Sequence, residues 1–206
     1  MKQKEWQEAQ DNFLYFYLFL FLKNNSCEKM NEIPNLFVLT GAPSSGKTTL
    51  IKELEKRGFK VVHEVAREYI EEEISKGKTL EKIREDELLF QREIVKRKLK
   101  IEEELPENEI IFLDRGIPDG IAYCELFNVD SRWIKKISKN RYSKVFILED
   151  LDFIEDTVRI EDKETARKIG KRIFEVYLKL GYRVVYIKKE SVEKRIELIL
   201  KAIQKN

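Results

Sequence analysis

The chain has 206 residues, 42% of them hydrophobic, which is enough to fill the core of one full-sized domain. Its 40 Lys and Arg residues nearly balance 38 Asp and Glu residues, so the formal net charge is +2. This balance argues against nucleic acid as a partner, because binding a phosphate backbone requires a clear positive surplus. The two cysteines, Cys27 and Cys124, fit no zinc or redox spacing, so we expect reduced thiols and no cysteine chemistry.

The chain begins with a polar leader that runs into an aromatic, apolar segment over residues 13–22. This segment is too short to span a bilayer, which takes about 20 apolar residues. Acidic residues before it and the absence of a small-residue cleavage site argue against a secretory signal. We therefore predict a leader over residues 1–29 and one domain over residues 30–206. One interpretation is that this leader is an added segment or a mis-set start, since Met30 stands just before the first predicted strand. The alternatives are an interfacial membrane anchor and a segment that a partner covers.

From Asn35 onward, short apolar runs alternate with longer amphipathic stretches, which is typical of β-α units that form a parallel sheet. A charged segment between Thr79 and Leu105 has apolar residues at helical spacing and stops at Pro106. A further helix is expected to end at Leu180. The predicted strands are residues 36–40, 59–62, 110–114, 144–148 and 183–187.

The octapeptide GAPSSGKT, Gly41 to Thr48, follows the first predicted strand and precedes a helix-like stretch. Its spacing predicts a phosphate loop, in which Gly41 and Gly46 permit backbone angles that turn N–H groups toward phosphates. Lys47 would bridge the β- and γ-phosphates of a nucleoside triphosphate, and Thr48 would offer a hydroxyl to Mg²⁺. The predicted nucleotide-binding residues are Gly41, Ala42, Pro43, Ser44, Ser45, Gly46, Lys47, Thr48 and Thr49.

The third predicted strand ends directly in Asp114 and Arg115. Because parallel sheets bind ligands beyond the carboxyl ends of their strands, Asp114 is the predicted second Mg²⁺ ligand beside Thr48. Arg115 could stabilise the negative charge of a transferring phosphoryl group.

The second predicted strand gives way to a helix at His63 and Glu64. Glu64 is a candidate general base, because a carboxylate there would face the phosphate site and could accept the proton of an acceptor hydroxyl. His63 is expected to be a packed or surface residue. Arg67 could either pair with Glu64 or hold an anionic substrate.

Further along, Arg159 and then Arg167 are the candidate arginines of a lid that closes over the phosphates. A helix start rich in solvated charge is the alternative interpretation of that segment. Asp119, Tyr123 and Gln91 are candidates for lining an acceptor pocket.

Together, GAPSSGKT, HEVAREYI, FLDRGIPDGIAY and DTVRIEDKETARKI resemble the small AAA-like P-loop domain family that includes the NadR-type nicotinamide riboside kinases. The resemblance covers residues 36 to 201. It implies an α/β fold, with a five-stranded parallel sheet of kinase-type strand order flanked by helices. In that order the Asp114 strand lies next to the phosphate-loop strand. The resemblance also implies ATP and Mg²⁺ as ligands. In the more distantly similar deoxynucleoside kinases, Glu64 and Asp114-Arg115 match the base and the acidic-Arg pair, although Gly116 stands where those enzymes have Ser.

The sequence thus predicts a cytoplasmic, ATP- and Mg²⁺-dependent kinase that acts on an unidentified small molecule or nucleoside-like hydroxyl. Catalysis is assigned to Lys47, Glu64, Asp114, Arg115 and Arg159. A second hypothesis is a switch that hydrolyses ATP or GTP and docks a partner protein through residues 80–105; the absence of a GTPase base-recognition motif favours ATP. A membrane-associated regulator would rest on residues 13–22 alone.

Overall fold

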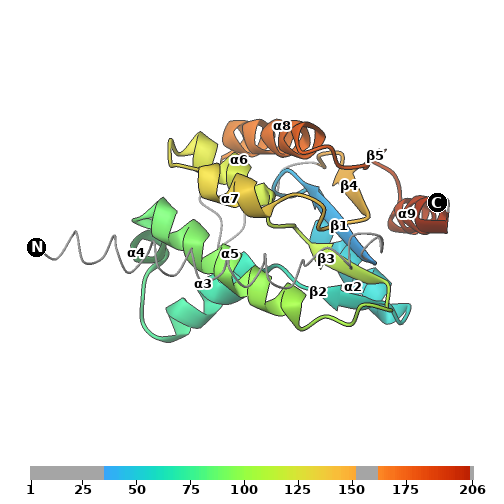
Figure 1. Cartoon of the computed structure of the whole chain (residues 1–206), viewed down its shortest axis with the longest axis horizontal. Helices are drawn as coiled ribbons and strands as arrows, with labels where there is room; N and C mark the ends of the chain where they lie inside the picture. The colour runs from blue at the N-terminus through green and yellow to red at the C-terminus, as the bar shows by residue number, and fades with distance from the viewer. Residues whose placement is uncertain (1–34, 152–161, 205–206) are drawn as a thin grey trace, which may run out of the picture. The chain divides into compact units, whose positions relative to one another are not determined.

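The computed structural model describes residues 35–151 and 162–204 of the chain (Figure 1). Its strands form one five-stranded parallel sheet in the order β2-β3-β1-β4-β5. The predicted α/β class is therefore confirmed, and so is the pairing of the Asp114 strand with the phosphate-loop strand. Each strand also lies within one residue of its predicted bounds: β1 (Leu36–Gly41), β2 (Lys60–Val62), β3 (Ile111–Asp114), β4 (Lys144–Leu148) and β5 (Val184–Ile187).

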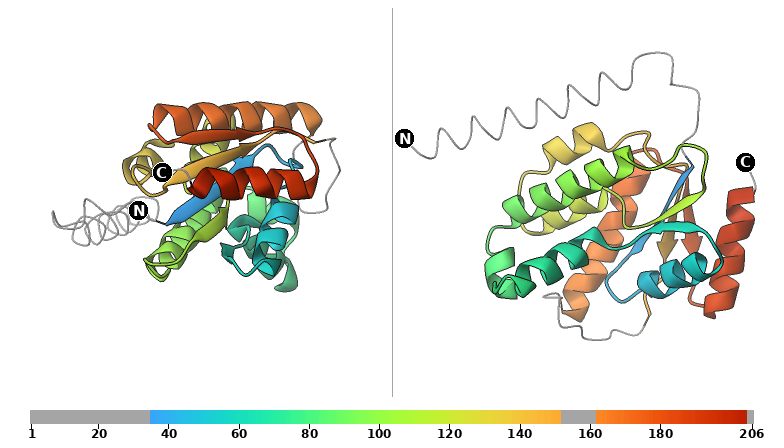
Figure 2. Two further views of the ribbon diagram at one scale, coloured as in Figure 1. Left: turned by 90° about the vertical axis from the view of Figure 1, so that its right-hand side faces the viewer. Right: turned by 90° about the horizontal axis from the view of Figure 1, so that it is seen from below.

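Helices cover both faces of the sheet, with α2 and α9 on one side and α5, α6 and α8 on the other (Figure 2). This layering follows from the sequence pattern, because a central parallel strand that is apolar on both faces must be covered on both. The helices are α2 (Lys47–Lys56), α3 (Val65–Ser75), α4 (Leu80–Arg84), α5 (Glu87–Glu103), α6 (Asp119–Leu126), α7 (Arg132–Ile137), α8 (Lys163–Lys179) and α9 (Val192–Gln204).

The charged segment between Thr79 and Leu105, predicted to be helical, is divided into α4 and α5. The break occurs at Asp86, whose extended backbone ends the first helix and whose carboxylate accepts a hydrogen bond from Leu89 N at 3.0 Å. Such a cap satisfies an N–H group that has no partner inside the helix. The division into two helices thus follows from the cap of α5 at Asp86, a local signal that helical periodicity alone does not reveal.

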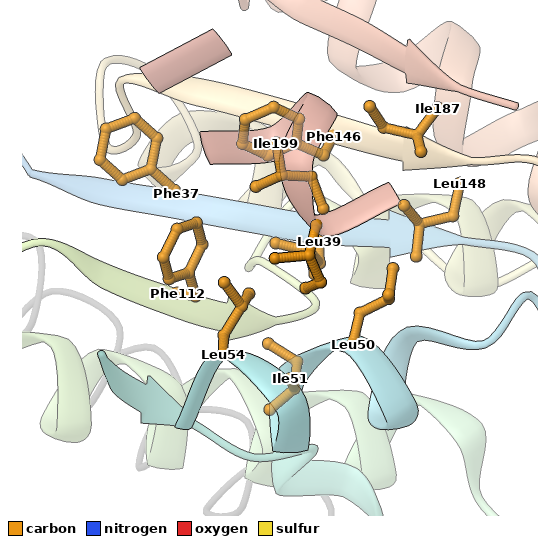
Figure 3. Close-up of a cluster of buried hydrophobic side chains, with 11 residues drawn as sticks. Phe37, Leu39, Leu50, Ile51, Leu54, Phe112, Phe146, Leu148, Ile187 and Ile199 are labelled. Carbon is orange, nitrogen blue, oxygen red and sulfur yellow. The ribbon is translucent and has the colours of Figure 1, made fainter. Parts of the chain in front are cut away.

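One hydrophobic core lies between the sheet and the pair α2 and α9 (Figure 3). In it, Leu39 of β1 lies between Ile51 of α2 and Ile199 of α9, and Leu50 and Leu54 of α2 pack into the same cluster. Burying each such side chain stabilises the fold by about 1.5 to 3 kcal/mol relative to exposure. The packing fixes the start of α2 directly behind β1, which is the position that a phosphate loop requires.

In the described residues, no helix has the length and apolar character needed to cross a membrane. The predicted leader, residues 1–29, lies outside the described residues, as does the lid candidate Arg159. The division of the chain at Met30 stays a prediction.

Candidate phosphate and acceptor site

The predicted phosphate loop connects β1 to α2 with backbone angles that glycine permits. Gly41 has φ 141° and Gly46 has φ 83°. A Cβ atom on Gly41 would lie 2.7 Å from Leu148 O, and one on Gly46 would lie 2.9 Å from the Leu151 side chain. Both positions therefore exclude a side chain by conformation and by space.

Helix α2 begins at Lys47 without a side-chain cap, so its first N–H groups are directed at the loop. Lys47 Nζ donates hydrogen bonds to Ala42 O at 2.7 Å and to Ser45 Oγ at 3.1 Å. Its ammonium thus lies inside the loop, at the place where phosphate oxygens would replace the carbonyl acceptors. Thr49 is exposed on α2, and Pro43 lines a neighbouring pocket described below.

Thr48 and Asp114 meet at the carboxyl end of the sheet, as predicted. Thr48 Oγ1 donates to Asp114 Oδ2 at 3.3 Å, while Asp114 Oδ1 is buried and has no hydrogen-bond partner among the described residues. Burial raises the pKa of Asp114, and the charge of Glu64 raises it further, whereas Lys47 and Arg115 oppose the shift. An unpartnered buried oxygen beside a threonine hydroxyl fits a divalent cation.

This donor set suits Mg²⁺ in particular. Mg²⁺ is usually held by one or two protein oxygens, with water and substrate phosphates completing its shell. The described residues contain no group of three or more His, Cys, Asp or Glu side chains that could hold a metal without such help.

Arg115 lies at the centre of the site. Its backbone is in a left-handed conformation with φ 69°, and its side chain is buried. Its Nε donates to Glu64 Oε1 at 2.9 Å, and its Nη1 donates to Gly41 O and to Asp119 Oδ1, both at 3.2 Å. The planar guanidinium therefore joins the phosphate loop to the candidate base. The structure brings together Glu64, Arg115 and the phosphate loop, which the sequence predicted from separate motifs.

Asp119 is buried and serves as an acceptor for four donors. Besides Arg115, these are the Thr40 hydroxyl, Gly116 N at 3.1 Å and Tyr177 Oη at 2.7 Å. The tight packing also explains Gly116, because a Cβ atom there would lie 2.4 Å from Tyr177 Oη. Serine, the residue of the deoxynucleoside kinases at this position, would not fit beside that tyrosine.

Next to Arg115 lies a pocket with a cavity volume of about 70 Å³, which is partly open to solvent. Gln91, Asp119 and Tyr123 line it, as the sequence suggested, and so do Glu64 and Arg67. The other lining residues are Pro43, Ala66, Ile70, Arg84, Phe90, Ile94, Val95, Lys98, Arg115, Ile117 and Gly120.

Two other predicted positions lie away from this pocket. His63 Nε2 lies 3.3 Å from Glu55 Oε1 on the surface, one of the two positions expected for it. Arg167 is exposed on the first turns of α8.

Sequence reasoning missed three residues near the site. Lys98 of α5 is buried and lines the pocket. Arg195 of α9 is buried behind the phosphate loop and donates to Ser45 O at 3.0 Å. Asp150 follows β4; burial raises its pKa, while the charges of Lys47 and Arg167 act in the opposite direction. The rule that identified Asp114 at a strand end could have found Asp150 as well, whereas Lys98 and Arg195 lie within helices.

Comparison with known proteins agrees with this geometry. A family model described as AAA domain matches residues 36–195. The structure of NadR protein in complex with NR has a TM-score of 0.63 at 18% identity, covering 84% of this chain and 50% of NadR. The chain thus spans about half the length of the NadR chain. No curated protein matches it.

Two shorter kinases have the same fold along nearly their whole length. Thymidylate kinase from Ehrlichia chaffeensis has a TM-score of 0.60 at 18% identity, covering 82% of this chain and 98% of that chain. Deoxyadenosine kinase from M. mycoides with bound dCTP has a TM-score of 0.58 at 15% identity, covering 83% and 100%. At these identities the likeness establishes the fold.

Proposed function

The chain belongs to the AAA domain family, and on that premise we propose that it is an ATP- and Mg²⁺-dependent kinase of a small, nucleoside-like acceptor. Its P-loop fold implies nucleotide binding and is similar to the folds of nucleoside and nucleotide kinases. The observation that supports the proposal is the Arg115 contact to Glu64 at 2.9 Å, because the same guanidinium donates to Gly41 O of the phosphate loop and Glu64 lines the pocket. A hydrolase needs no second pocket for an acceptor.

In this proposal each side chain has a distinct task. Lys47 and the loop N–H groups bind the triphosphate, and Thr48 and Asp114 hold Mg²⁺, which would neutralise phosphate charge. Glu64 accepts the proton of the acceptor hydroxyl as its oxygen attacks the γ-phosphate. Arg115 orients Glu64 and contributes positive charge beside the transferring group.

The test measures ADP release from Mg-ATP in the presence and absence of a panel of nucleosides, ribosides and other small metabolites. Acceptor-dependent turnover with a phosphorylated product supports the kinase. Release that is indifferent to every acceptor would instead support the hydrolysing switch.

Two substitutions examine the site assignment. Lys47→Ala should lower the rate of phosphoryl transfer about 10² to 10³ fold, which corresponds to the loss of one strong transition-state contact. The matched control is Lys52→Ala, on the exposed side of α2, which should leave turnover unchanged. If Asp114→Ala preserves metal-dependent activity, the assigned metal site is wrong.

A further inference from the structure

The pocket carries more positive than negative side chains. Its lining includes four cationic residues, Arg67, Arg84, Lys98 and Arg115, against the two carboxylates Glu64 and Asp119. Both carboxylates accept hydrogen bonds from Arg115. Arg67 and Arg84 form ion pairs with Glu71 and Glu87. Among the described residues, the lining cation without a carboxylate at ion-pair distance is therefore Lys98, and a neutral acceptor would leave its charge uncompensated.

Lys98 is the lining residue whose positive charge is least compensated by carboxylates. It is 7% exposed, and its Nζ donates to Arg115 O at 3.2 Å and to Gly116 O at 3.0 Å. An ammonium group has three N–H donors, so one is left over. Among the described residues, no carboxylate lies within ion-pair distance of it. The nearby Asp119 carboxylate already has four other donors.

Burying an ammonium group without an anionic partner is costly, because the charge loses its hydration. Burial accordingly lowers the pKa of Lys98, with the charge of Asp119 acting in the opposite direction. A bound anion would supply the missing partner. Arg84 differs, because its Nη2 lies 2.8 Å from Glu87 Oε2 and that charge is already compensated.

Building on the proposed kinase function, we propose that the acceptor is a phosphate monoester whose phosphate group is bound by Lys98, while a hydroxyl group of the same molecule faces Glu64. A phosphate group would give the buried Lys98 ammonium its missing anionic partner, and phosphate is a frequent ligand of lysine. The pocket is partly open to solvent, so the rest of a nucleoside monophosphate or a sugar phosphate can extend out of it. In the reaction, the γ-phosphoryl group moves to the hydroxyl oxygen, ADP leaves and the hydroxyl proton passes to Glu64.

The first measurement is equilibrium binding by calorimetry, with the full chain saturated by Mg²⁺ and a non-hydrolysable ATP analogue. AMP, CMP, dTMP and ribose 5-phosphate are compared with adenosine, cytidine, thymidine and ribose. At least one monoester should bind about 10 to 100 times more tightly than its phosphate-free parent. Preference for nucleotides over ribose 5-phosphate would identify the source of the monoester. Equal or tighter binding of the parents, or no binding of any monoester, overturns the inference.

The second measurement uses Lys98→Met, which keeps the length of the side chain and removes its charge. Its affinity for the preferred monoester should fall about 10 to 100 fold, while its affinity for the ATP analogue stays unchanged. Lys100→Gln, at an exposed position on the same helix, should bind both ligands as the wild type does. Unchanged monoester binding by a folded Lys98→Met variant contradicts the assignment. The wild-type comparison remains decisive if this variant does not fold.

Product analysis separates this inference from the kinase proposal. Phosphorus NMR of the wild-type reaction should show a second phosphate ester on a hydroxyl oxygen. A diphosphate product would place the monoester at the transfer position and overturn the role of Lys98. Turnover of phosphate-free alcohols alone would preserve the kinase and reject the inference. Binding of a monoester without transfer would preserve the anion site and reject the kinase.

Discussion

Asp119 provides a direct test of how the centre of the site is held together. Replacing Asp119 with Asn keeps the shape of the side chain but removes its charge and turns one acceptor oxygen into a donor. One carbonyl oxygen remains for the four donors that the carboxylate now serves. The substitution also removes one of the two carboxylates that compensate the buried Arg115.

The magnitude follows from these contacts. Leaving two buried donors poorly matched costs about 1 to 3 kcal/mol each, and losing a buried charge partner costs about 3 to 5 kcal/mol when nothing else compensates. Arg115 still has Glu64 and Gly41 O, and Tyr177 Oη can rotate to accept from the new amide. We therefore expect Asp119→Asn to lower the free energy of unfolding by about 2 to 4 kcal/mol.

Urea unfolding followed by circular dichroism measures this loss, with Tyr177→Phe and the double variant completing a thermodynamic cycle. Tyr177→Phe alone should cost about 1 to 2 kcal/mol, and the double variant should cost at least about 0.5 kcal/mol less than the sum of the two. Glu190→Gln, at an exposed position away from the site, should leave the midpoint unchanged. A loss below about 1 kcal/mol for Asp119→Asn, or strict additivity in the cycle, would refute the reasoning.

Three further predictions concern packing and titration. Gly116→Ser should lower the free energy of unfolding in urea by about 1 to 3 kcal/mol, because its Cβ would lie 2.4 Å from Tyr177 Oη, and an unchanged free energy of unfolding would contradict this. Burial raises the pKa of Cys124 to about 12, so in a Cys27→Ser chain the remaining thiol should react with a disulfide reagent at pH 8 only after unfolding. Rapid reaction of the native chain would rule this out. Hydrogen bonds from Arg97 and Lys76 lower the pKa of Glu72 from 4.5 to about 2, so its contribution to stability is present above pH 4.5 and is lost as the pH falls toward 2. Glu72→Gln should therefore be less stable than the wild type at pH 7 and equal to it near pH 2. A difference in stability that does not change with pH would contradict this prediction.

The phosphate loop and the sheet could be predicted because their signals are local. The residues that shape the loop lie within Gly41–Thr48, and each buried strand is a continuous apolar run. Asp114 and Glu64 could be located because the carboxyl ends of parallel strands share one edge of the sheet. Their mutual arrangement through Arg115 also depended on a left-handed residue that no sequence rule requires at that position.

Lys98 and Arg195 show where sequence reasoning stops. Lys98 contacts carbonyl groups 17 and 18 positions away, and Arg195 contacts a carbonyl 150 positions away. On their helices both residues look like ordinary solvated charges, because charge at helical spacing usually marks the exposed face. Only the packing of α5 and α9 against the carboxyl-end loops of the sheet shows that these charges are buried.

Arg115 connects the phosphate loop with the proposed acceptor pocket through one rigid group. Its Nη1 contacts Gly41 O in the loop, and its Nε contacts Glu64 at the pocket. Lys47 contacts the adjacent carbonyl, Ala42 O, and must exchange it for phosphate oxygens when a nucleotide binds. The loop carbonyls and the carboxylate that we propose as the base therefore contact the same guanidinium. A lysine at position 115 would have a single nitrogen and could not span both contacts, so the planar fork of arginine is what aligns the two halves of the site.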